Sequence, residues 1–259
     1  MVHPEVEVSV LGPVQIRGAA RPFARAAARE LVVYLALHPD GARTAVWADA
    51  LWPTRAVSPA TMHSTASDAR RSLGRSSSGA EHLPRGGRRL QLGDAVGTDV
   101  ERFTRLASGG EPRHAMEALG LIRGALFDGL SLADWAVFDG TQARVESMVA
   151  VTALQAARAC MSLGRGADAE WMIRQALRIS SYDERLYRAL LRATDAQGNR
   201  TGLRATMAEL LSKAADPSGL PVGGAATRPG PAIHPRTVAL YRELAHGAAT
   251  AAGRASYRL

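Results

Sequence analysis

Cysteine is nearly absent from this chain of 259 residues, in which Cys160 is the only one. No disulfide can form within the chain, and no zinc site that depends on several cysteines can be built. Such a chain suits a reducing compartment, so we expect a cytoplasmic protein. No uncharged apolar run reaches the roughly 18 residues that a membrane-spanning helix needs, and the N-terminus shows no signal-peptide pattern.

Aromatic residues are also scarce, at 5%, whereas alanine and other small aliphatic residues are abundant. Small side chains favour close contacts between helices over a β-sandwich. Lys213 is the only lysine, so arginine carries nearly all of the positive charge behind a net charge of +8. This charge should attract polyanions, of which nucleic acid is the most common. The alternative is that the charge reflects only codon bias and solubility.

Catalytic and metal-binding motifs are missing as well. The seven histidines show neither HxxxH nor HExxH spacing, and no GxSxG, Walker or GxGxxG pattern occurs. We therefore expect a protein that is not an enzyme and that holds neither a metal ion nor a cofactor.

The N-terminal part has the pattern of a winged helix-turn-helix domain. Alternating residues predict strands over 5–11 and 14–17, with Val6, Val8 and Val10 on one face. Helical spacing then predicts three helices, over 26–37, 45–51 and 59–73. In the third helix, Ser58 is the expected N-cap, Pro59 the first residue and Gly74 the C-terminal stop. A strand, a Gly-Gly turn and a second strand over 82–92 would form the wing.

From Thr98 onward the strand signals stop, and the pattern predicts helices over 99–106, 111–126, 132–163, 167–179, 183–197, 201–213 and 235–244. Gly164 and Gly198 lie in two inter-helix loops that are 34 residues apart, which is the period of a tetratricopeptide repeat. We expect Trp135, Phe138 and Trp171 to pack between helices. The predicted fold is thus mainly α: a winged helix-turn-helix domain (1–97) and an all-helical, tetratricopeptide-like domain (98–259).

The order of these segments resembles that of actinobacterial regulators with a bacterial transcriptional activation domain, such as the antibiotic regulatory proteins. The resemblance rests on seven stretches: 8–14, 30–37, 50–53, 69–74, 98–103, 182–191 and 234–237. It implies an OmpR-type winged helix that binds duplex DNA. It also implies a helical domain that contacts RNA polymerase, another protein or an effector, or that forms a homodimer.

In a winged helix the third helix enters the major groove and the wing contacts the backbone or the minor groove. On a helical wheel, Met62, Ala66, Ala69 and Leu73 form the inward stripe. Residues 69–92 hold six arginines against one acid, Glu81. Hydroxyl, imidazole and guanidinium groups suit contacts with base edges and phosphates. The predicted DNA-binding residues are Thr61, His63, Ser64, Ser67, Arg70, Arg71, Arg85, Arg88 and Arg89.

One alternative function stays open. Helix 59–73 is poor in large apolar and basic residues, and Asp68 is expected beside its reading face. The winged helix would then have lost DNA binding and would serve as a protein-interaction or signalling module. Such a module would form the cytoplasmic end of a larger membrane protein, and its basic wing would bind an acidic partner.

Overall fold

The computed structural model describes residues 4–86, 88–130, 134–215 and 233–256. The described strands form one sheet in the order β2-β1-β3, with bounds β1 (Val6–Ser9), β2 (Gln15–Arg17) and β3 (Val96–Thr98). β1 pairs antiparallel with β2 and parallel with β3. Val6, Val8 and Val10 are fully buried, so the face predicted from their alternation is confirmed.

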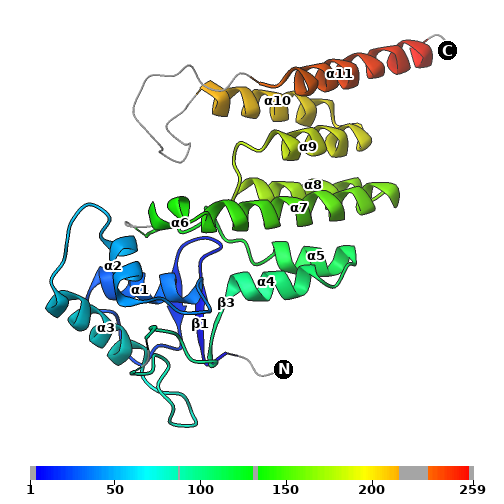
Figure 1. The fold of residues 1–259 in the computed structure, drawn as a ribbon. Helices are drawn as coiled ribbons and strands as arrows, with labels where there is room; N and C mark the ends of the chain where they lie inside the picture. The colour runs from blue at the N-terminus through cyan, green and yellow to red at the C-terminus, as the bar shows by residue number, and fades with distance from the viewer. Residues whose placement is uncertain (1–3, 87, 131–133, 216–232, 257–259) are drawn as a thin grey trace. The chain divides into compact units, whose positions relative to one another are not determined.

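The chain divides into two compact units, residues 1–106 with 123–145, and residues 107–122 with 146–259. In the first unit, α1 packs against α2 and α3 beside the sheet (Figure 1). These helices are α1 (Ala26–Ala36), α2 (Thr44–Leu51) and α3 (Pro59–Leu73), close to the predicted bounds. Their buried side chains include Leu31, Leu35, Trp47, Leu51 and Leu73. The predicted order of two strands and three helices is therefore confirmed.

Residues 123–145 return to the first unit after α4 (Asp99–Ala107). The buried carboxylate of Asp99 accepts the backbone N–H groups of Val10 at 2.8 Å and Leu11 at 3.0 Å. The guanidinium of Arg123 lies 3.4 Å from the same carboxylate. Burial raises the pKa of Asp99, and these hydrogen bonds and Arg123 oppose the shift. Asp99 thus ties the start of α4 and the returning segment to the turn after β1.

The returning segment contains α6 (Asp134–Phe138), which packs against α2. The Trp135 ring is buried and contacts Tyr34 edge-to-face, with 5.0 Å between ring centroids. Burial of Trp135 agrees with the prediction. The prediction was wrong for Phe138, which is 80% exposed.

The predicted wing hairpin over 82–92 is not formed by the described residues on either side of Gly87. Leu90 instead exchanges two backbone hydrogen bonds with Ala42, at 2.9 and 2.8 Å. Glu81 forms an isolated antiparallel β-bridge with Arg75. Pro84 has no N–H to donate, which weakens pairing across the expected turn. The third strand of the sheet is β3, which lies directly before α4.

Two predicted helices are interrupted. The helix expected over 111–126 ends at Leu119 as α5 (Pro112–Leu119). The one expected over 132–163 splits into α6 and α7 (Thr141–Ser162), with residues 131–133 outside the described part. Gly140 separates them with a φ of 77°. The carboxylate of Asp139 accepts the N–H of Thr141, the first residue of α7, at 2.9 Å.

The described part of the second unit is built from consecutive helices. Around α9 lie α8, α10 and α11, each in contact with it (Figure 1). The bounds are α8 (Gly166–Leu177), α9 (Glu184–Ala196), α10 (Arg200–Ala215) and α11 (Pro235–Ser256). Asp183 accepts the Arg185 N–H at 2.8 Å as the N-cap of α9. The mainly helical fold, with a small sheet and a tetratricopeptide-like helical part, is confirmed.

Candidate nucleic-acid interface

Helix α3 begins and ends as its sequence predicts. The hydroxyl of Ser58 accepts the Thr61 N–H at 3.2 Å, and Pro59 occupies the first helical position. Gly74 follows the helix with a φ of 77°, a backbone conformation that residues other than glycine rarely adopt. A Cβ atom at Gly74 would lie 2.6 Å from that of Ala20, so this end of the helix also requires glycine for space.

The buried face of α3 is rotated from the predicted one. Its buried residues are Thr65, Asp68, Ala69, Ser72 and Leu73. Met62 and Ala66, which were expected to point inward, are half-exposed. Asp68, which was expected beside the reading face, is only 7% exposed, and its carboxylate lies 3.5 Å from Arg71.

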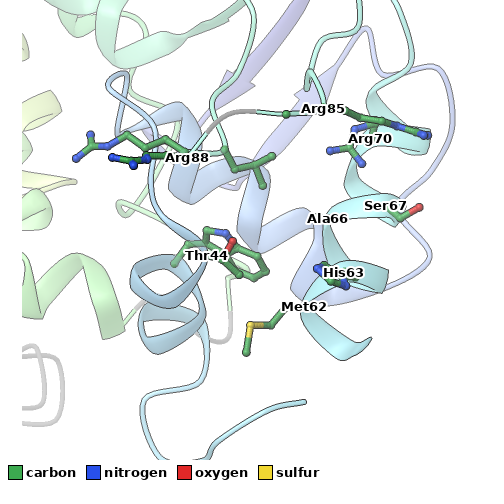
Figure 2. Close-up of a pocket in the computed structure, with 12 residues that line it drawn as sticks. Thr44, Met62, His63, Ala66, Ser67, Arg70, Arg85 and Arg88 are labelled. Carbon is green, nitrogen blue, oxygen red and sulfur yellow. The ribbon is translucent and has the colours of Figure 1, made fainter. Parts of the chain in front are cut away.

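A groove of about 360 Å³ lies between α2, α3 and the loop after Leu83 (Figure 2). Four of its lining side chains are arginines, and no acidic residue appears among the described residues that line it. From α2 come Thr44 and Trp47; from α3 come Met62, His63, Ala66, Ser67 and Arg70; and from the loop come Arg85, Gly86, Arg88, Arg89 and Leu90. The groove therefore combines a positive rim with hydroxyl and imidazole groups.

Arg70 is the least exposed of the predicted DNA-binding arginines for which an ion pair is seen, and it bonds within the protein. Its Nε donates to the Leu83 carbonyl at 2.8 Å, and its side chain is 15% exposed. Burial lowers the pKa of Arg70, and Arg85 lowers it further while Glu81 opposes the shift. Figure 2 shows Arg70 and Arg85 on one side of the groove and Arg88 on the other. Arg70 thus links α3 to the start of the loop at Leu83.

Two hydroxyl groups predicted as DNA contacts also bond within the protein. The Ser64 hydroxyl donates to the Thr61 carbonyl at 3.0 Å and accepts a guanidinium hydrogen from Arg25 at 2.9 Å. The Thr61 hydroxyl lies 3.0 Å from that of Ser58. Neither residue is among those that line the groove, whereas His63 and Ser67 are.

The remaining predicted arginines lie at the surface. Arg71 is exposed at the C-terminal end of α3, 3.5 Å from Asp68, and Arg88 is exposed at the groove. Arg89 donates to the carbonyl oxygens of Asp40 and Gly41, at 3.1 and 3.3 Å. These bonds hold Arg89 against the loop after α1 without neutralising its charge.

Sequence reasoning did not assign Thr44 and Trp47 to the interface, although both line the groove. The helical spacing places Trp47 on the apolar face of α2, and its side chain is indeed buried. The Ala42–Leu90 pairing brings the loop across this face. Because the two residues are far apart in sequence, no local signal predicts that pairing.

The side chains that line this groove suit the recognition of an anion. The arginines supply charge and directed N–H donors, and His63 and Ser67 supply shorter polar groups on α3. Among the residues that the structure describes, no group of three or more His, Cys, Asp or Glu side chains could hold a metal ion. None of the described helices is long and apolar enough to cross a membrane.

Comparison with known families bears out the resemblance predicted from the sequence. Residues 98–203 match the bacterial transcriptional activator domain family. Among solved structures, the fold is similar to that of Mycobacterium tuberculosis EmbR in complex with a low-affinity phosphopeptide, with a TM-score of 0.62 and 22% sequence identity. The match covers 94% of this chain and 65% of the EmbR chain, so this chain spans just under two thirds of that length. A search of curated proteins finds no match.

Proposed function

We propose that this chain is a transcriptional regulator module that binds duplex DNA through α3 and the loop 82–92. The observation that carries this proposal is the groove between α2, α3 and the loop, which four arginines line. The match of residues 98–203 to the bacterial transcriptional activator domain supports the regulatory role. The proposed DNA-binding domain, residues 1–97, lies within the first compact unit, and residues 98–259 form the proposed activation domain.

The side chains at the groove have different proposed roles. His63 and Ser67 line it from α3 and are the proposed readers of base edges. Arg71, Arg88 and Arg89 are the proposed phosphate contacts, and Arg85 joins them at the loop. Arg70 positions the loop through its bond to Leu83. Thr61 and Ser64 then support the start of α3 through the Ser58 and Arg25 contacts.

The helical unit is the proposed contact for RNA polymerase, another protein or a second copy of the chain. Stacked helical pairs offer extended surfaces to protein partners. Among the described residues of this unit, four large apolar side chains are exposed, namely Val151, Leu163, Trp171 and Leu211. The complex of EmbR with a phosphopeptide is a precedent for a peptide partner in a protein of similar fold. A regulator that binds chromosomal DNA would act in the cytoplasm of a bacterium.

The test is fluorescence anisotropy with labelled duplex DNA over a series of salt concentrations. We expect Arg88→Ala/Arg89→Ala to weaken binding. Each lost phosphate contact should reduce the salt dependence, on a log–log plot, by about one unit. The matched control is Arg192→Ala/Arg204→Ala, which removes two exposed arginines from α9 and α10. Equal losses of affinity in both variants would mean that the effect comes from net charge alone. If the wild type does not bind DNA at low salt, the proposal is wrong.

One observation favours a second candidate function, a protein-interaction module with a degenerate winged helix. The guanidinium of Arg70 bonds to Leu83 and lies beside Glu81, and Arg89 bonds to two carbonyl groups, so part of the basic surface is occupied internally. Under this alternative the loop would bind an acidic protein segment, and the chain could be the cytosolic part of a membrane-anchored protein. The same anisotropy series would then show no binding to duplex DNA.

A further inference from the structure

A single carboxylate, Glu81, lies among three arginines next to the proposed DNA-binding groove. Its oxygens are 3.2 Å from Arg75, 3.8 Å from Arg70 and 4.0 Å from Arg85. Only Arg70 and Arg85 of this group line the groove itself. The arginines come from α3, from the residue that follows Gly74 and from the loop after Leu83. Three separate parts of the chain thus place positive charge around one acidic group.

The cluster carries three positive charges against one negative charge, and its outer face is open to solvent. The side chains of Arg75 and Arg85 are 64% and 76% exposed, whereas that of Glu81 is 19% exposed. Arg75 is oriented by a second bond, from its Nη1 to the Gly79 carbonyl at 2.8 Å. A guanidinium group has five N–H donors, so Arg75 and Arg85 can each bond to a second oxyanion.

We propose that Glu81 is an internal competitor for a DNA phosphate, and that the phosphate binds between Arg75 and Arg85 where the carboxylate now interacts. This inference rests on the proposed function, and it adds Arg75 and Glu81 to the interface. Both a carboxylate and a phosphodiester accept hydrogen bonds from guanidinium groups, so the two anions compete for the same donors. The Glu81 charge also repels an approaching phosphate.

The consequence is a built-in reduction of sequence-independent affinity. A carboxylate within 4 Å of the guanidinium groups lowers the positive potential that attracts the DNA backbone. Base contacts from α3 do not depend on this cluster. Glu81 therefore weakens binding to every DNA sequence alike, which increases the share of the affinity that comes from base reading.

The first test compares Glu81→Gln with Asp94→Asn in the salt-dependent anisotropy assay. Both substitutions remove one negative charge, and Asp94 is exposed and forms no ion pair with Arg70, Arg75 or Arg85. We expect Glu81→Gln to bind random-sequence duplex DNA roughly threefold to tenfold more tightly, with a salt dependence about one unit steeper. In an Arg75→Gln background the gain should shrink. Equal gains in Glu81→Gln and Asp94→Asn would overturn the inference and leave the proposed function standing.

The second test does not use DNA. Thermal unfolding of the full chain is followed with increasing sulfate, a simple oxyanion, against chloride of matched ionic strength. We expect sulfate to raise the Tm of Glu81→Gln more than that of the wild type or of Asp94→Asn. If this occurs while no variant binds DNA, the oxyanion site is supported and the proposed function fails. If sulfate does not distinguish the variants and DNA affinity is unchanged, the inference is wrong.

Discussion

Glu30 lies in the middle of α1 with only 3% of its surface exposed, and its Oε1 accepts the indole N–H of Trp135 at 2.8 Å. Burial raises the pKa of Glu30 above its ordinary value, although the Trp135 hydrogen bond and Arg29 oppose the shift. The buried carboxyl group of Glu30 thus lies at the contact between α1 and α6, where the Trp135 indole donates a hydrogen bond to it. The group connects two segments that are 105 residues apart in the chain.

This carboxyl group should make stability depend on pH. The pKa of Glu30 is higher in the folded than in the unfolded chain. The contribution of this group to folding stability is therefore fully present below pH 4.5, and it is lost as the pH rises through the folded pKa. Glu30→Gln keeps the acceptor for Trp135 and removes the charge. We expect the variant to gain stability relative to the wild type as the pH rises from 4 to 7, measured by urea unfolding.

Glu117→Gln is the control for this experiment, because Glu117 is exposed on α5. Its stability relative to the wild type should stay nearly constant over the same pH range. A constant difference for Glu30→Gln as well would show that the carboxyl group is not perturbed in solution.

Among the elements, the stability of α3 depends more on the residues at its two ends than on buried apolar side chains. Only Ala69 and Leu73 of its buried residues are aliphatic, while Thr65, Asp68 and Ser72 are polar. The helix is instead defined by Ser58 and Pro59 at the start and by Gly74 at the end. Ser72 also donates to the Pro22 carbonyl at 3.2 Å, which holds the helix against the segment before α1.

Removing the N-cap should therefore destabilise the protein measurably. Ser58→Ala leaves the Thr61 N–H without its acceptor, and we expect a loss of about 1 kcal/mol in the free energy of unfolding. Ser58→Thr keeps a hydroxyl group and should recover most of that loss. Chemical denaturation of the two variants beside the wild type measures both effects. A loss that Ser58→Thr fails to reverse would mean that the cap contact is not the cause.

For the whole molecule, the first unit includes residues far downstream of residues 1–97. Residues 123–145 pack with residues 1–106, and Trp135 contributes contacts to Tyr34, His38 and Phe127 as well as the bond to Glu30. A piece of the chain that ended at residue 97 would therefore lack buried side chains that complete this unit. The unit is compact in space but not contiguous in sequence.

Trp135→Ala should lower the stability of the first unit by about 3–5 kcal/mol, because it leaves a cavity and removes the partner of Glu30. Phe138→Ala, in the same helix, should change stability by less than about 0.5 kcal/mol, since that ring is 80% exposed. Amide hydrogen exchange measures the effect separately for each unit. Faster exchange is expected in α1 and not in α9, and equal exchange changes in both helices would contradict the two-unit division.

Helices α1, α2, α3 and α9 and the buried face of β1 could be predicted from sequence alone. Their signals are local: the spacing of apolar residues, the caps Ser58 and Asp183, and the stop at Gly74. The concentration of arginine in residues 69–92 was equally visible. These features depend on residues a few positions apart, so neighbouring side chains are enough to specify them.

The tertiary structure decided how those local pieces meet. Leu90 pairs with Ala42 rather than across the Gly-Gly turn, and Trp135 returns to Glu30. Glu81 lies among three arginines from separate segments, and Asp68 is buried instead of facing solvent. Each of these outcomes depends on contacts between distant residues or on the rotation of a helix by about one position. Their free energies come from burial and hydrogen bonding in the assembled unit, which local propensity does not contain.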